Sequence, residues 1–385
     1  MEMIAYTDWA AEKARLEADG RKAGLGIVSY VEGTGIGPYE GSRVQVQASG
    51  RVSVVTGVGT QGQGHMTVFA QIAADQLGVS VDDVRVVFGD TDHAYGFGSY
   101  SSRATVYCGG ATILAARDVR EKARTIAAHA MEVSPEDVEL DDGQFTVRGS
   151  PANSMSWAEV SKLASHRPAK LPPGVDPGLD SMHKYMANEW GTFASAAHCA
   201  EVEVDIETGE VKILDYVIAE DCGTVVNPLG VEAQIQGGIG QGIGGTFLED
   251  MYYDASGQLI AGTFMDYLLP GFTDVPDVEV YHQETPSPIN VGGFKVSPIK
   301  VESALRETPG VADIRVYARR SSLAGQLVAC DVMTESGHER GTVRAALLET
   351  ARSALSPPER PRIVKFVERI DQTAALKVAR GETGE

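Results

Sequence analysis

The sequence predicts an α+β protein in two parts, with a boundary close to residue 290. Its 385 residues suffice for two or three domains, and 43% apolar and 22% charged residues are ordinary for a globular chain. Segments that alternate with a period of two are interspersed with segments of helical spacing. The charge also changes, because residues 1–290 carry 18 basic and 41 acidic side chains whereas residues 291–385 carry 15 and 12. We therefore expect one domain over 1–290 and a second over 291–385.

The first part opens with a charged, weakly amphipathic pattern that predicts a helix over 1–22. Apolar and polar residues then alternate over 24–35 and 42–59, which predicts strands. A glycine-rich turn leads into residues 65–79, whose apolar spacing is helical. Residues 81–91 return to a strand pattern.

The remainder of the first part is predicted to be mostly helical, with one hairpin. A long amphipathic helix is expected over 111–133 and a short helix over 154–165, before a proline-rich linker over 166–180. Residues 196–221 form two alternating runs around Glu207-Thr208-Gly209, which predicts a hairpin. Residues 231–250 have helical spacing interrupted by glycines.

The second part alternates between helix and strand patterns. A helix is expected over 299–311, ended by Pro309 and Gly310, and another over 340–355. Strand patterns occupy 312–319, 325–335 and 362–370. This order is typical of a small α+β domain.

Composition excludes several classes of function. The four cysteines, Cys108, Cys199, Cys222 and Cys330, include no CxxC pair, which argues against a disulfide framework, a zinc site or an iron–sulfur cluster in this chain. A net charge of −20 disfavours nucleic acid and anionic membranes as partners. Without a signal-peptide pattern or an apolar run of about 18 residues, the expected location is the cytoplasm.

Three glycine-rich segments of the first part share one chemistry. They cover residues 59–67, 98–111 and 220–245, and the first two lead into predicted helices. Backbone N–H groups at a helix start suit phosphates or the polar edge of a heterocycle, and glutamine amides can read a pterin or nucleobase edge. Each segment alone is explained as well by tight packing. Together they favour a large polar ligand held by backbone groups.

The motifs "GQGHMTVFAQIAADQLGV", "GFGSYSSRAT", "DCGTVVNP", "EAQIQGGIGQGI" and "ETPSP" occur here in that order. This series resembles the C-terminal, molybdopterin-binding half of a molybdenum hydroxylase large subunit, over about residues 20–290. The family is that of xanthine dehydrogenase, and the pattern is most similar to its carbon monoxide dehydrogenase type. The resemblance implies molybdopterin cytosine dinucleotide as cofactor, hydroxylation with oxygen from water, and electron transfer to iron–sulfur and flavin subunits.

The resemblance also implies which residues contact the cofactor. Carried over motif by motif, these are Gln61, Gly62, Gln63, Gly64, His65, Ser101, Ser102, Arg103, Ala104, Asp221, Cys222, Gly223 and Gln236. Arg103 is expected to be an available charged donor. No residue is assigned as a metal ligand.

Two features of the family are not found in this sequence. One is the preceding domain, which faces the molybdenum from the other side. The other is a "GVGE" loop, expected just after "ETPSPIN", whose glutamate is the proposed general base. The resemblance therefore implies a cofactor shared with a partner chain that supplies the other half of the large subunit, while iron–sulfur and flavin groups reside in further subunits.

Residues 291–380 resemble the C-terminal subdomain of adenylate-forming acyl-CoA and aryl-CoA synthetases. In that family a Gly-Gly loop, here Gly292 and Gly293, serves thioester formation, and a lysine in a P-x-T-x-x-G-K loop serves adenylation. The loop here ends in Lys377, but Asp371 replaces the proline and Leu376 the glycine. Lys377 is accordingly either a catalytic lysine or a solvated surface lysine.

Three functions follow from these expectations. The favoured one is an enzyme subunit of a molybdenum hydroxylase-like oxidoreductase in a heteromeric complex. The alternatives are a non-catalytic or repurposed binding and assembly protein, and an acyl-CoA or aryl-CoA ligase component acting in trans. An aromatic or CoA-linked substrate would suit both enzymatic hypotheses.

Overall fold

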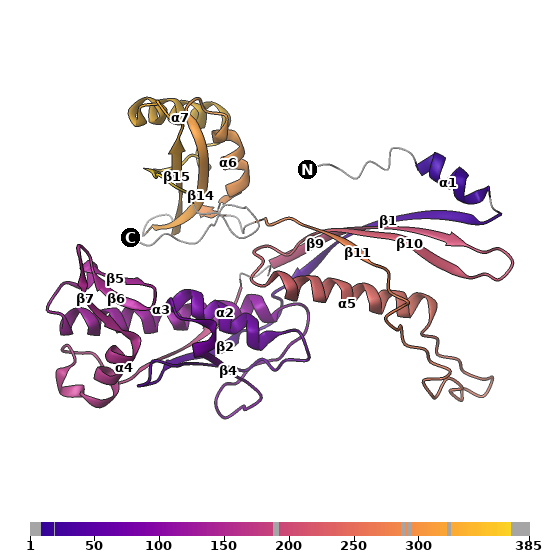
Figure 1. The fold of residues 1–385 in the computed structure, drawn as a ribbon, viewed down its shortest axis with the longest axis horizontal. Coiled ribbons are helices and arrows are strands. Elements are labelled where there is room, and N and C mark those ends of the chain that lie inside the picture. The colour runs from indigo at the N-terminus through magenta and orange to yellow at the C-terminus, as the bar shows by residue number, and fades with distance from the viewer. Residues whose placement is uncertain are drawn as a thin grey trace. The chain divides into compact units, whose positions relative to one another are not determined.

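The structure is a computed structural model that describes residues 9–18, 20–187, 192–285, 289–291, 294–321 and 325–370. The chain divides into two compact units, Met1–His282 and Gln283–Glu385. Both units mix helices with strands (Figure 1), which confirms the predicted α+β class. The division falls somewhat earlier than residue 290, because the strand Ile289–Val291 pairs with strands of the second unit.

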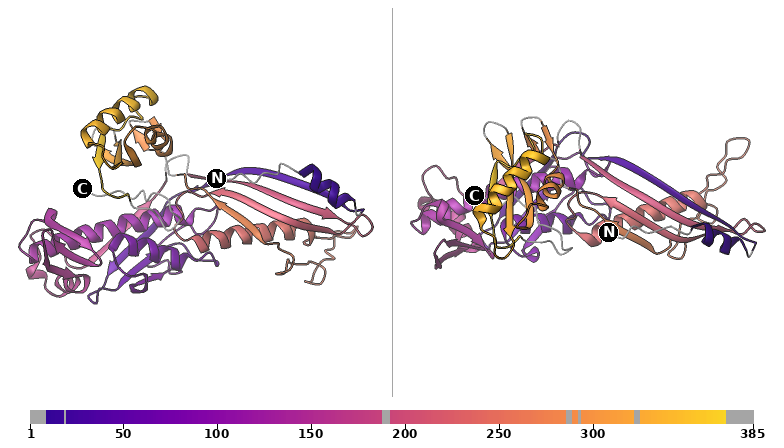
Figure 2. Two further views of the ribbon diagram at one scale, coloured as in Figure 1. Left: turned by 45° about the horizontal axis from the view of Figure 1, so that its top comes forward. Right: turned by 90° about the horizontal axis from the view of Figure 1, so that it is seen from above.

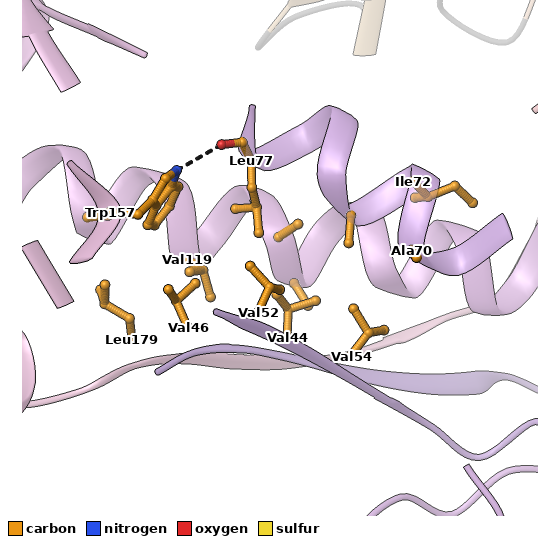
Figure 3. Close-up of a cluster of buried hydrophobic side chains, with 14 of the residues drawn as sticks. Val44, Val46, Val52, Val54, Ala70, Ile72, Leu77, Val119, Trp157 and Leu179 are labelled. Atoms are coloured by element: carbon orange, nitrogen blue, oxygen red, sulfur yellow. Dashed lines mark hydrogen bonds between the residues drawn. The ribbon is translucent and has the colours of Figure 1, made fainter. Parts of the chain in front are cut away.

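The first sheet of the first unit has the strand order β4-β3-β2-β8. Its strands are β2 (Glu40–Val46), β3 (Val52–Thr56), β4 (Val84–Val87) and β8 (Leu179–Tyr185). Helices α2 (His65–Leu77) and α3 (Ala104–Ala130) pack on it (Figure 3), and Val44, Val46, Val52 and Val54 are almost completely buried beneath them. This core anchors the two helices whose first turns carry the predicted cofactor contacts.

A smaller sheet and a helix extend the same core. The sheet consists of β5 (Val138–Asp141), β6 (Gln144–Val147) and β7 (Ser150–Ser156), and α4 (Trp157–His166) follows it. The indole N–H of Trp157 donates a hydrogen bond of 2.9 Å to the carbonyl of Leu77, which ties α4 to the end of α2 (Figure 3). Short 3₁₀ helices lie at Val81–Asp83, Pro135–Asp137 and Pro168–Lys170.

The second large sheet of this unit has the order β1-β9-β10-β11. Its strands are β1 (Lys22–Thr34), β9 (Thr192–Val204), β10 (Val211–Asp221) and β11 (Val278–His282); α1 (Trp9–Glu17) precedes β1. Strands β1, β9 and β10 are antiparallel neighbours, while β11 runs parallel to β10. Helix α5 (Pro228–Phe247) lies along one face of the sheet (Figures 1 and 2), where Ile239 and Ile243 pack with Ala196 and Ile218.

The second unit is a five-stranded sheet packed against two helices. The strands are β12 (Ile289–Val291), β13 (Phe294–Val296), β14 (Val311–Ser321), β15 (Gly325–Thr334) and β16 (Ile363–Phe366), and β15 pairs with β12, β14 and β16. Helices α6 (Pro298–Arg306) and α7 (Arg340–Ala354) bury Val301, Leu305, Val343 and Leu347 in a core of their own. The unit therefore has an independent apolar centre.

Several elements differ from the sequence-based expectation. The first helix ends at Glu17, before Gly20 with its positive φ of 81°, and residues 22–34 form a strand. Helix α3 begins at Ala104 instead of residue 111, so that Gly110 lies inside it. A Cβ at Gly110 would come within 2.6 Å of the Tyr185 ring, so this glycine permits close packing and does not belong to a turn. The strands β5 to β8 and β11 to β13 were not expected.

The helices that the structure describes differ in length. The longest, α3, has 27 residues and carries charged side chains along its length, including Arg117, Asp118, Arg120 and Glu121. No helix in the described part of the chain is long and apolar enough to cross a membrane.

Candidate cofactor site

A cavity of about 1110 Å³ lies in the first unit, between the sheet β1-β9-β10-β11 and the turns that precede α2, α3 and α5. Its volume lies slightly above the range of about 300–1,000 Å³ that is usual for small-molecule sites. The lining residues that matter for its chemistry come from all of these elements: Tyr30, Glu32, Gln61, Gln63, His65, Ser101, Ser102, Arg103, Ala104, His198, Tyr216, Glu220, Cys222, Asn227, Gln234, Gly238, Gln241 and Gly242. All three glycine-rich segments, residues 59–67, 98–111 and 220–245, thus border the same cavity.

The turn before α2 holds five of the predicted contacts. Gly62 and Gly64 have φ values of 111° and 75°, which only glycine adopts without strain, and a Cβ at either position would meet no atom within 4 Å. The Gln63 amide links this turn to the next one, because its Nε2 donates 3.2 Å hydrogen bonds to Gln61 Oε1 and to Ser99 Oγ. Gln61, Gln63 and His65 line the cavity, whereas Gly62 and Gly64 give the turn its shape.

His65 is the first residue of α2 and is only 4% exposed. Its ring stacks on Phe69, with a centroid separation of 5.3 Å. Within the described residues, no hydrogen-bond partner lies near its buried Nδ1. Burial is the main cause that lowers the pKa of His65. A buried imidazole nitrogen on the wall of a cavity fits a ligand that supplies the missing partner.

The turn before α3 holds four more of the predicted contacts, all of which border the cavity, although Arg103 has no exposed surface of its own. Ser101 and Ser102 have positive φ values of 48° and 49°, an uncommon conformation for serine. Ser102 Oγ donates a 3.0 Å hydrogen bond to Glu32 on β1, which joins the turn to the second sheet. Strain held in place by such contacts is frequent at ligand sites.

Arg103 is completely buried and does not match the expectation of an available donor. It forms an ion pair with the equally buried Glu40. Its guanidinium also donates to backbone carbonyls of two loops: Ile36 at 2.9 Å, Pro38 at 3.0 Å, Gly98 at 3.2 Å and Tyr39 at 3.5 Å. These bonds use all five N–H donors of the side chain. Arg103 therefore holds the loops around the cavity together, and its role as a direct contact stays a prediction.

The end of β10 holds Asp221, Cys222 and Gly223. Asp221 Oδ1 accepts a 3.0 Å hydrogen bond from the backbone N–H of Gly223, which closes a tight turn. Of the three residues only Cys222 is among those that line the cavity. Desolvation of its sulfur atom, and then the neighbouring Glu220, raise the pKa of the Cys222 thiol to about 12, although the residue as a whole is exposed. The thiol is consequently protonated near neutral pH and is a poor nucleophile there.

The residues of helix α5 that line the cavity do not include Gln236, the residue predicted from the sequence. Gln234, Gly238 and Gln241 line it, whereas Gln236 does not. Residues four and seven positions apart share a helix face, but two positions correspond to a rotation of about 200°. Gln236 accordingly points away from Gln234, and the geometry gives its role as a contact no support. The periodicity of the helix could have selected Gln234 and Gln241 in advance.

Two helices have uncapped N-termini at the cavity. Gly64 and Arg103 occupy the N-cap positions of α2 and α3; glycine has no side chain to form a cap, and the Arg103 side chain makes no capping hydrogen bond. The first N–H groups of a helix need external partners, and the helix dipole favours an anion there. Arg103 is the one Lys or Arg side chain among the described lining residues, and its charge is balanced by Glu40. Anion binding would thus depend on backbone groups.

Two remaining expectations concern metal ligands and the residues singled out in the second unit. No group of three or more His, Cys, Asp or Glu side chains suited to a metal ion occurs among the residues that the structure describes. Gly292, Gly293 and Lys377 lie outside the described residues.

Comparison with known proteins identifies the family to which this fold and its cavity belong. Residues 1–276 match the molybdopterin cofactor-binding domain family, and residues 300–377 match the AMP-binding enzyme C-terminal domain. The first match covers most of the chain. The chain therefore belongs to the molybdopterin cofactor-binding domain family.

Similar proteins agree with this assignment. The carbon monoxide dehydrogenase large chain of Hydrogenophaga pseudoflava is 34% identical over 332 residues, which cover 82% of this chain and 40% of that protein. The nicotine 6-hydroxylase large subunit of Paenarthrobacter nicotinovorans is 35% identical and is covered to 38%, with 76% of this chain aligned. The solved structure of quinoline 2-oxidoreductase from Pseudomonas putida 86 superimposes with a TM-score of 0.70 and 40% identity, over 76% of this chain and 39% of that one.

These comparisons confirm the predicted fold of the first part as that of a molybdenum hydroxylase large subunit. The chain spans about two fifths of the length of these relatives, so the comparisons assign it only part of the large-subunit fold. The match of residues 300–377 indicates an additional domain like that of AMP-binding enzymes.

Proposed function

We propose that this chain forms part of the molybdopterin cytosine dinucleotide site of a molybdenum hydroxylase and needs the rest of a large subunit to complete it. The observation that carries the proposal is the pair of uncapped helix N-termini, α2 and α3, beside one large cavity. Such termini bind phosphate groups through backbone N–H donors. Membership of the molybdopterin cofactor-binding family supports the choice of ligand.

The residues present fit such a cofactor. The unpartnered Nδ1 of His65 and the glutamine amides of Gln61 and Gln63 can meet polar ring edges. A Cβ at Gly238 or Gly242 on α5 would meet no atom within 4 Å, which leaves room for a ligand to approach the helix. Arg103 acts as a positioning residue that fixes the loops around the first turn of α3. The bound cofactor would supply the redox chemistry at molybdenum, and this chain would bind and orient it.

Dependence on further protein follows from the charge of the cavity. Its described lining offers Glu32 and Glu220 as acidic groups, while its one arginine is paired with Glu40. A dinucleotide carries two negatively charged phosphates, so additional positive groups would stabilise it. We infer that these, together with the general base and the wall opposite the helix termini, come from the remaining part of a large subunit. Iron–sulfur and flavin subunits would then accept the electrons.

The test is cofactor occupancy in the complex that contains this chain. Pterin content would be measured after release from the wild type and from Gly64→Val, which places a β-branched side chain at a φ of 75° directly before α2. We expect occupancy to fall several-fold. Gly149→Val is the control, because Gly149 has a similar φ of 77° but lies in the turn between β6 and β7, away from the cavity. Equal occupancy in both variants would refute the proposed site.

For the second unit we propose a retained binding or assembly role instead of adenylation. Its match to the AMP-binding enzyme C-terminal domain includes position 377, so Lys377 falls within the matched range. The surrounding loop departs from the family at Asp371 and Leu376. A ligase function in trans is therefore the less favoured proposal.

A further inference from the structure

Strand β1 lies at one edge of the sheet β1-β9-β10-β11. All 13 of its residues pair with β9 in one unbroken register, from Lys22 opposite Val204 to Thr34 opposite Thr192. It is the terminal strand of that sheet among the described residues. The other edge, β11, has only five residues.

The middle of β1 is exposed on both faces. Every residue from Gly26 to Glu32 is exposed, although successive side chains of a strand point to opposite sides. Ile27 and Val31 are 73% and 71% exposed on one face, and Val28 and Tyr30 are 60% and 46% exposed on the other. Tyr30 lines the cavity, whereas Ile27 and Val31 lie on the other face, where exposure of large apolar side chains is typical of a surface that another chain covers.

The usual devices that protect an edge strand are missing from this stretch. Natural edges are kept from pairing by prolines, bulges, charges or short length. Gly26–Glu32 contains no proline and one charge, and its pairing with β9 has no bulge. The N–H and C=O groups along its outer side are therefore a template for one more strand.

The neighbouring strand extends this surface on the face that lies away from the cavity. In the register of the sheet, Val31 stands opposite Ser195 and Ser29 opposite Ala197, and Phe193 nearby is 62% exposed. Small residues flanked by large apolar ones provide a flat area on which a second layer of protein can pack. The cavity, by contrast, is lined by Tyr30, Glu32 and Thr34 of the opposite face.

We propose that β1 receives a β-strand from that part of a molybdenum hydroxylase large subunit which this sequence does not span. The inference rests on the proposed function. The matched family region, residues 1–276, includes β1, and relatives carry this region within chains more than twice as long as the aligned part. The remaining large-subunit sequence is thus the protein expected beside this sheet. A second copy of the chain pairing through β1 is the competing outcome.

The experiment measures backbone hydrogen exchange of this chain alone and after co-expression with the rest of the large subunit from the same source. We expect exchange across residues 26–32 to slow by more than about tenfold in the complex, since an added strand satisfies the outer N–H groups. Ile27→Lys with Val31→Lys should weaken the complex more than about tenfold, because it places charges at the new contact. Ile206→Lys, on a 64% exposed residue of the β9–β10 turn, is the matched control and should change affinity less than about twofold.

The outcomes separate this inference from the proposed function. A complex whose β1 amides exchange as fast as in the free chain overturns the inference, even if it contains molybdopterin. So does the absence of a complex, or slow exchange that depends only on the concentration of this chain, which would indicate a homodimer. Protection of β1 in a complex without molybdopterin would support the inference and refute the proposed cofactor site.

Discussion

Arg103 and Glu40 form the buried ion pair on which the loops around the cavity depend. Removing one partner of a buried pair leaves an uncompensated charge, which typically costs about 3–5 kcal/mol. We expect Arg103→Ala to lower the free energy of unfolding by roughly this amount and to reduce cofactor occupancy in the complex. Urea unfolding of the chain and metal analysis of the complex would measure the two effects.

Arg43, which lies on the same strand β2 as Glu40, provides a matched control. It pairs with Asp180 at 2.7 Å, but the two side chains are 40% and 38% exposed, and such surface pairs contribute less than about 1 kcal/mol. Arg43→Ala should therefore leave both measurements nearly unchanged. An Arg103→Ala variant as stable as Arg43→Ala would contradict the structural role assigned to Arg103.

His65 makes stability depend on pH. Burial lowers its pKa in the folded chain, so the unfolded chain binds the proton at higher pH. Stability then rises with pH where only the unfolded state is protonated, and it falls as pH drops through about 6.5. We expect His65→Gln to flatten part of this slope in unfolding measurements between about pH 5.5 and 7.5. His198, whose pKa is also lowered by burial, should account for part of the remainder. An unchanged slope would show that His65 is not buried as described.

At the scale of single residues, the sequence could identify the motif positions but not what each side chain contacts. Gln61, Gln63 and His65 were predicted and do line the cavity. Arg103 was predicted as an available donor, yet its partner Glu40 lies 63 positions away, and nothing local in either motif indicates that pairing. Gln236 was predicted where helical phase favours Gln234 and Gln241.

At the scale of elements, the glycines of α5 allow a sharp test. Gly238 and Gly242 line the cavity, and a Cβ at either would contact nothing within 4 Å. Alanine is favoured over glycine inside a helix by about 1 kcal/mol. We therefore expect Gly238→Ala and Gly242→Ala to stabilise the chain to thermal unfolding while lowering cofactor occupancy in the complex.

Gly245 separates the expected gain in stability from the expected loss of cofactor occupancy. It is equally free of contacts and lies on the same helix, but it is not a cavity residue. Gly245→Ala should raise stability without lowering occupancy. If all three variants retain full occupancy, the cofactor does not approach α5.

Prediction of the elements succeeded where periodicity was long and failed where pairing is not local. Helices α2, α5 and α7 and the hairpin β9–β10 correspond to long, regular patterns, and α4 corresponds to a short one. Strand β7, with the sequence SPANSMS, is polar and mostly exposed, so no apolar alternation marks it. Strand β8 was assigned in part to a proline-rich linker, although it pairs with β2, which lies far away in the sequence.

At the scale of the whole molecule, the second unit should not act as a ligase by itself. Adenylation requires a lysine that reaches an acyl carboxylate and the α-phosphate of ATP, and Asp371 adds a negative charge near Lys377 in the sequence. We expect no pyrophosphate release from ATP with any carboxylic acid, and Lys377→Ala should leave the activity of the complex unchanged. Pyrophosphate release that needs both an acid and Lys377 would instead favour the ligase function.

The domain organisation was predicted from a change in composition, whereas the two compact units are separated by contacts. Charge and glycine content change near residue 291, but β12 already pairs with β13 and β15. The charge and glycine content of a segment depend on its exposure to solvent and on the ligands it binds. They contain no direct information on which strands pair. This explains why the class of each unit was easier to predict than the position of the division.

The molybdenum content per chain bears most directly on the proposed shared cofactor site. It would be measured by elemental analysis for the chain alone and for the chain co-expressed with the rest of the large subunit. The cavity offers helix termini but no unpaired Lys or Arg among its described lining residues. The chain should therefore bind the cofactor only when the rest of the large subunit is present. We predict little molybdenum on the chain alone and an amount approaching one atom per chain in the complex. A full complement on the chain alone, or none in a well-formed complex, would contradict the shared site.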